Sequence, residues 1–112
     1  MSDPSAVLVW CPFPDKQSAR DVVTLLLDER LIACANIIGE IESLFEWKGE
    51  VGQEIEVAVL FKTTSARSEI LISRLGEVHP YDTPAILGWT ADKTYPDTLA
   101  WLKEEVRGDP ER

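Results

Sequence analysis

The chain has few basic residues and no long apolar run, and each shortage excludes a class of protein. Eleven lysines and arginines stand against 20 aspartates and glutamates, so the formal net charge at pH 7 is -9. A surface of this sign repels phosphate backbones and anionic lipid headgroups, which argues against nucleic acid and membrane surfaces as partners. The longest apolar run, residues 6–11, is far shorter than the roughly 20 residues that span a bilayer.

The chain also has little cysteine and begins without the basic segment of a signal peptide. Because Met1-Ser2-Asp3-Pro4 carries no lysine or arginine, we expect a cytoplasmic location. In a reducing compartment the two cysteines, Cys11 and Cys34, are expected to remain free thiols. Their spacing matches neither a zinc ribbon nor a CxxC motif.

Length and composition predict one domain over residues 1–112. An apolar content of 45% is enough to build a core, and no segment has the composition of a linker. A chain this short leaves much of its surface exposed, so it gains stability from oligomerisation.

The first half of the chain shows a strand, a helix and a long hairpin. Residues 6–11 are continuously apolar, which is typical of a strand covered on both faces. A helix follows from an Asp15 cap to about Arg30. Apolar residues then alternate on both sides of Lys48-Gly49-Glu50, which predicts a hairpin. Each arm is longer than the usual strand of about 5 to 6 residues, so its far end needs a partner.

The second half adds a helix, a strand and a last helix. Thr64 or Ser65 is the expected cap of a helix that ends before Pro80. A strand is expected over residues 84–90, and Pro96 marks the first turn of the last helix. The order predicts an α+β fold, a ferredoxin-like β-α-β-β-α-β sandwich with an extra C-terminal helix. In this arrangement we expect the strands bearing Cys11 and Cys34 to be parallel neighbours whose thiols approach one another.

The one histidine lies in the segment EVHPYDTP, between the second helix and the last strand. An imidazole suits metal binding and proton transfer, but His79 alone is equally typical of a loop hydrogen bond to a carbonyl. Cys11, at the end of the first strand, is either a small buried apolar residue or, with an imidazole nearby, part of a soft site for copper or Zn(II). Burial is the default interpretation for Cys34.

Other patterns point away from catalysis. A cysteine and a histidine can form a nucleophile and its base, but we find no nucleophile elbow, GxGxxG motif or P-loop, so enzymatic activity is not expected. The hairpin glutamates are interpreted as a solvated face and not as a cation site. They are Glu40, Glu42, Glu46, Glu50, Glu54 and Glu56.

Taken together, several segments resemble the CutA family, the divalent-cation tolerance proteins. They are Cys11 with Pro14-Asp15, RLIACANI (residues 30–37), the turn Trp47-Lys48-Gly49-Glu50, Phe61-Lys62-Thr63-Thr64, the loop His79-Pro80-Tyr81-Asp82-Thr83-Pro84, and Trp101-Leu102. The resemblance spans nearly the whole chain in the family's order, so it is specific although each segment alone is weak.

The resemblance implies a homotrimer similar to the PII signalling proteins, in which the long hairpin pairs with a neighbouring subunit. It also implies a role in divalent-metal tolerance, with copper bound through Cys11 and His79. Two residues differ from copper-binding members: Val78 stands where they have a second histidine, and Ala85 where many have a glutamate. Cys34, Asp82 or a neighbouring subunit is then a candidate to complete the ligand set.

A second hypothesis is a PII-like sensing or scaffolding trimer, in which metal is incidental. Its ligand would be a small molecule bound in clefts between subunits, near Trp47, Lys62 and Tyr81.

Overall fold

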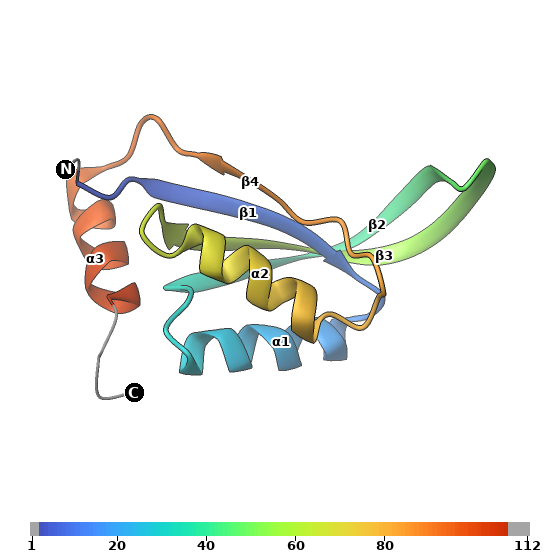
Figure 1. The fold of residues 1–112 in the computed structure, drawn as a ribbon, viewed down its shortest axis with the longest axis horizontal. Coiled ribbons are helices and arrows are strands. Elements are labelled where there is room, and N and C mark those ends of the chain that lie inside the picture. Colours follow the sequence, from blue (N-terminus) through green and yellow to red (C-terminus); the bar gives the residue numbers. More distant parts are fainter. Residues whose placement is uncertain (1–2, 108–112) are drawn as a thin grey trace.

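The computed structural model describes residues 3–107, which form one four-stranded antiparallel sheet and three helices (Figure 1). In chain order the elements are β1 (Ala6–Phe13), α1 (Lys16–Asp28), β2 (Cys34–Trp47), β3 (Glu50–Thr64), α2 (Ser68–Val78), β4 (Leu87–Thr90) and α3 (Pro96–Val106). The strand order β2-β3-β1-β4 and the two helices α1 and α2 on one face confirm the predicted ferredoxin-like α+β fold. Within this part of the chain, no helix is both long and apolar enough to cross a membrane.

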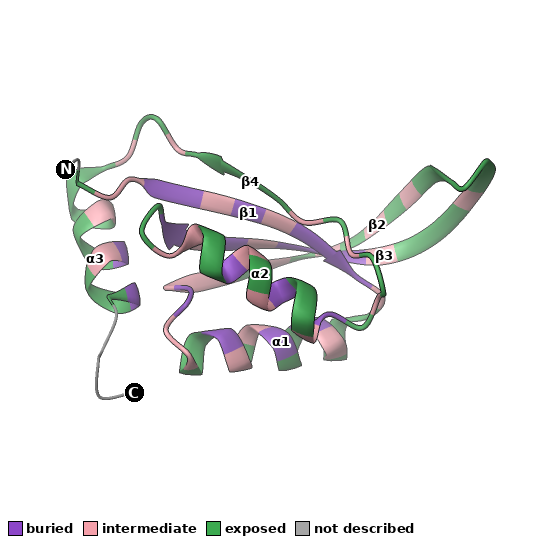
Figure 2. Cartoon of the chain, in the orientation of Figure 1, coloured by how far each residue is buried: buried purple, intermediate pink, exposed green. Residues whose placement is uncertain are grey.

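The core fills the space between the sheet and α1 and α2. Val9 and Phe61 face one another across β1 and β3, and both are fully buried, as are Leu26 of α1 and Leu71 and Leu75 of α2. Alternation along the strands and three-to-four spacing along the helices bring these side chains to one layer. Figure 2 shows the buried residues on this side and mainly exposed residues along β4 and the end of the hairpin.

Several predicted boundaries are corrected by the structure. Asp15 does cap α1, since its carboxylate accepts a hydrogen bond from the Ser18 amide at 2.7 Å. Thr64 and Ser65 do not cap α2: Thr64 belongs to β3, and the Ser65 hydroxyl accepts from the Ser5 amide at 2.8 Å. The helix therefore starts only at Ser68. The last strand is also shorter than residues 84–90, because Pro84, Ala85 and Ile86 remain outside the ladder.

The expectation that the two cysteine-bearing strands are neighbours is wrong. β3 lies between β1 and β2, with Cys11 opposite Val59 and Cys34 opposite Lys62. Because Val59 and Lys62 are three residues apart, and directly opposite residues share a face, the two side chains point to opposite faces of the sheet. Cys11 faces the helices and is buried, whereas Cys34 is half-buried on the uncovered face.

The hairpin extends well beyond the rest of the sheet (Figure 1). Pairing between β1 and β3 ends at Phe13 and Val57, so residues 50–56 are paired with β2 alone. Lys48 and Gly49, with φ of 51° and 84°, form its two-residue turn. The projecting ribbon exposes large apolar side chains, and a two-stranded ribbon alone is only marginally stable in water. They are Leu44, Phe45, Trp47, Val51 and Ile55.

Two glycines allow a matched test of the backbone. Gly39 follows a register irregularity in β2 and has φ +129°, whereas Gly76 lies within α2, and no atom would obstruct a Cβ at either position. We expect Gly39→Ala to lower the free energy of unfolding by about 1–3 kcal/mol, because only glycine tolerates that φ. Gly76→Ala should raise it by about 0.5–1 kcal/mol. Urea unfolding at one chain concentration measures both changes in the free energy of unfolding. If both substitutions changed it in the same direction, the backbone conformation described at Gly39 or Gly76 would be wrong.

Candidate functional site

The candidate site lies where the loop after α2 meets the end of β1 and the base of the projecting hairpin. His79 is the C-cap of α2, and its amide donates to the Leu75 carbonyl at 2.9 Å. Pro80 follows directly and prevents further helix, so the chain turns toward β3. The loop thereby brings His79 against Pro12 and Phe13, residues far away in the sequence, and Tyr81 against His79.

Hydrogen bonds to both ring nitrogens hold His79 in one neutral form. Its Nε2 lies 2.8 Å from the Pro12 carbonyl oxygen, which can only accept, so Nε2 carries the proton. Its Nδ1 accepts from the Tyr81 amide at 3.1 Å. The ring is 7% exposed and stacks on Phe13 with 4.4 Å between centroids. Burial lowers the pKa of His79, while the Pro12 carbonyl and the Glu56 charge oppose that shift.

Cys11 shares a hydrogen-bond acceptor with His79. Its Sγ lies 3.7 Å from the Pro12 carbonyl oxygen that Nε2 of His79 also approaches. The thiol is fully buried. Burial first, and the charge of Glu56 second, raise its pKa to about 12. A thiol that stays protonated and out of contact with solvent is a poor nucleophile, so the geometry does not suit the hydrolytic chemistry weighed above.

The structure thus brings two of the three expected metal ligands together and separates the third. Cys34 lies on the other face of the sheet, with β3 between it and Cys11. Across residues 3–107 no three residues among the histidine, cysteines and carboxylates are grouped as a metal site. Val78, where a second histidine would stand, packs against the core, and Ala85 is exposed at the edge of the loop.

A cavity of about 610 Å³ lies between this loop and the projecting hairpin. Tyr81 forms one wall, and its hydroxyl donates to Oε2 of Glu56 at 2.9 Å. Burial and the Glu56 carboxylate raise the pKa of Tyr81 to about 12, so the phenol remains a donor. Of the three residues that the second hypothesis places in clefts between subunits, Trp47 and Tyr81 line this cavity of a single chain, and Lys62 does not.

Glu56 is a functional candidate that the sequence reasoning missed. The sequence pattern predicts one solvated face for the hairpin glutamates, whereas Glu56 is half-buried and lies opposite Ile41, one position from buried Val57. Its place in the sequence directly before the buried part of β3 is the feature that could have distinguished Glu56 from the other hairpin glutamates. Its hydrogen bond to Tyr81 joins β3 to the loop, and both residues line the cavity.

Phe45 lies across the hairpin because its partner is a glycine. Gly52 stands opposite Phe45, and a Cβ at Gly52 would be 2.6 Å from Phe45 Cε2. Contacts below 3 Å are excluded, so any larger residue would displace the ring. This pairing turns the ring over the strand and makes it part of the cavity wall.

Comparison with known proteins gives one consistent result. The family model for the CutA1 divalent ion tolerance protein matches residues 7–105. The divalent-cation tolerance protein CutA of Pyrococcus horikoshii is 43% identical over 101 residues, covering 90% of this chain and 98% of that protein.

Two solved structures have the same fold. CutA1 from Ehrlichia chaffeensis superposes with a TM-score of 0.87 at 30% identity, over 94% of this chain and 98% of that one. The periplasmic divalent cation tolerance protein CutA from Archaeoglobus fulgidus superposes with 0.86 at 27% identity, over 91% and 99%.

The neutral state of His79 has a pH-dependent consequence. The pKa of a histidine in an unfolded chain is about 6.5, and the pKa of His79 in the folded protein is lower. His79 therefore contributes stability that is complete above about pH 6.5 and is lost as the pH falls through the folded pKa. Because the chain has one histidine, its Hε1 resonance in NMR reports this titration directly.

We expect the titration midpoint of the His79 Hε1 resonance to be lower in the folded protein than in denaturant. We also expect the thermal midpoint to fall more between pH 7.5 and 5.5 in the wild type than in His79→Gln, which cannot ionise. A folded midpoint equal to or above the denatured one would contradict the neutral tautomer.

Proposed function

This chain belongs to the CutA1 family of divalent ion tolerance proteins, and from that premise we propose that it acts as a homotrimer that binds copper or a similar metal ion. One observation carries the proposal: Sγ of Cys11 and Nε2 of His79 approach the same carbonyl oxygen, that of Pro12, so a thiol and an imidazole lie within one small region of the core. This donor pair suits soft or borderline ions such as Cu(I), Cu(II) and Zn(II).

In the described geometry these donors are not ready for a metal ion. The thiol is protonated, and both nitrogens of His79 already have hydrogen-bond partners. Binding therefore requires loss of the Cys11 proton and release of the Pro12 carbonyl by the imidazole. Such a site binds its ion reversibly and more tightly at higher pH, which suits a cargo ion better than a permanent cofactor.

The proposal includes a binding role without catalysis and a cytoplasmic location. Support for the first comes from the buried, protonated state of Cys11. Support for the second comes from two free cysteines on opposite faces of the sheet, which cannot pair with each other. A relative at 27% identity is described as periplasmic, so fractionation of the source cells is the direct check of this location.

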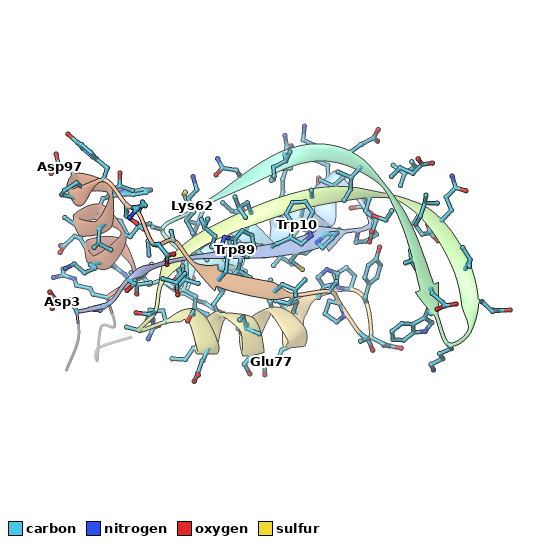
Figure 3. All side chains as sticks on the ribbon, turned by 90° about the horizontal axis from the view of Figure 1, so that it is seen from above. Asp3, Trp10, Lys62, Glu77, Trp89 and Asp97 are labelled. Carbon is cyan, nitrogen blue, oxygen red and sulfur yellow. The ribbon has the colours of Figure 1, made fainter. Side chains whose placement is uncertain are left out.

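The open strand edges and the uncovered sheet face of a single chain support the trimer. The outer edge of β2 and the ribbon edge of β3 have no strand beside them within residues 3–107. The sheet face away from α1 and α2 presents Lys62, Trp89 and Trp10 (Figure 3). Open strand edges and apolar faces favour association, and a closed ring satisfies them without further growth.

A second candidate function is a trimer that senses a small ligand. The cavity between the hairpin and the loop favours it, since a volume of about 610 Å³ is within the range of small-molecule sites. This cavity holds neither Cys11 nor Cys34, so the two candidates can be tested separately.

Copper titration tests the donor pair. We expect Cys11→Ser and His79→Gln each to weaken copper binding by about tenfold or more, because each removes one ligand of the pair. Affinity in the wild type should rise by about tenfold per pH unit between pH 6 and 8 if one thiol proton is released. Calorimetry in two buffers of different ionisation enthalpy counts that proton.

Cys34→Ser is the matched control, since it removes a thiol on the other face of the sheet. Circular dichroism establishes that each variant is folded. If copper binds Cys11→Ser and His79→Gln as tightly as the wild type, the assignment of the pair is wrong. If only Cys34→Ser loses copper affinity, the site lies on the uncovered face of the sheet.

Sedimentation velocity tests the assembly. We expect a species of three times the 12.6 kDa chain mass. Ile55→Lys, which charges an apolar residue of the projecting ribbon that is 56% exposed, should produce monomers because it places a lysine in the subunit contact. Ile70→Lys on α2, at 51% exposure, should leave the trimer intact. A wild-type monomer, or equal effects of the two lysines, would refute the hairpin-mediated trimer.

A further inference from the structure

The cavity between the hairpin and the loop has aromatic walls on two sides. Phe45 and Trp47 project from β2 on one side, and Tyr81 projects from the loop on the other. Phe45 is held over Gly52, and Tyr81 is held by its hydrogen bond to Glu56 and by packing on His79 at 4.9 Å between centroids. Two of the walls are thus fixed before a ligand arrives, which reduces the entropy lost on binding.

The polar groups of the cavity are predominantly acidic. Glu46, Glu56 and Asp82 line it, and Lys48 is its one basic residue. The charge of the whole chain, -9, has the same sign. A negative potential at a partly enclosed surface attracts cations and repels carboxylates and phosphates. Charge complementarity therefore selects a positively charged ligand.

The one basic side chain shows how such a ligand would be held. Nζ of Lys48 lies over the Trp47 ring, 5.7 Å from its centroid, which is within the range of a cation–π contact. Lys48 and Trp47 are at the turn of the hairpin, so this ammonium is on a flexible stem at the rim. Glu56 and Asp82 line the same cavity and would supply carboxylates for a ligand ammonium.

We propose that this cavity binds an organic ammonium ion that carries an apolar body. The ammonium group is held by Glu56 and Asp82, and the apolar body lies between Tyr81 and the aromatic rings of the hairpin. The inference rests on the second candidate function and names its ligand class, while it is independent of copper binding at Cys11. Glu56 retains acceptor capacity for this role, because an ionised carboxylate accepts about four hydrogen bonds and Tyr81 uses one oxygen.

Three small probes of one shape separate charge from apolar contact: phenethylammonium, 2-phenylethanol and phenylacetate. Each is titrated into the full-length protein and followed by the indole resonance of Trp47 in a 1H–15N spectrum, assigned with Trp47→Phe. We expect phenethylammonium to bind about tenfold more tightly than 2-phenylethanol, and phenylacetate to bind least, because the cation–π and carboxylate contacts require the positive charge. Added salt should reduce the difference.

Glu56→Gln tests the carboxylate while keeping an oxygen acceptor for the Tyr81 hydroxyl. We expect it to weaken phenethylammonium about five- to tenfold and to leave 2-phenylethanol unchanged. Glu42→Gln is the matched control, since Glu42 is on the opposite face of the same ribbon, opposite Ile55; it should change neither affinity.

Two outcomes overturn the inference. If 2-phenylethanol or phenylacetate binds as tightly as phenethylammonium, the cavity takes a ligand of another class, and the second candidate function survives without this assignment. If none of the three probes shifts the Trp47 resonance while the protein is folded and trimeric, the cavity binds no such ligand. Neither outcome affects the copper titration, which depends on Cys11 and His79.

Discussion

The hydrogen bond between Nε2 of His79 and the Pro12 carbonyl is the contact on which the site depends. It joins the loop after α2 to the last residues of β1, and it orients the ring so that Nδ1 can receive the Tyr81 amide. Tyr81 in turn reaches Glu56 on β3. A chain of contacts through one imidazole therefore links the end of β1, the loop after α2 and β3.

Much of the fold could be predicted from periodicity, but the arrangement of neighbours could not. The Asp15 cap, the long hairpin and the helix starting at Pro96 follow from local patterns, and the structure confirms them. The pairing of strands is a non-local property, so the position of β3 between Cys11 and Cys34 was predicted incorrectly. Likewise Ser65 has the chemistry of a helix cap but bonds to Ser5, sixty residues away in the sequence.

The candidate site was predicted in the same uneven way. Resemblance pointed to Cys11 and His79, and they do meet at one carbonyl oxygen. The sequence also showed both possible roles of His79, a loop hydrogen bond and a ligand, and the structure realises the first. Glu56 was hidden among six hairpin glutamates, because its special position follows from where β1 stops pairing with β3, at Val57.

The projecting ribbon forms one wall of the cavity. Beyond Val57 its two strands pair only with each other. Since an isolated two-stranded ribbon is marginally stable, subunit contacts along the ribbon would further stabilise that wall. Ligand capture and subunit assembly are in this sense linked equilibria, and a molecule that fits the cavity would also favour the assembled form at low protein concentration.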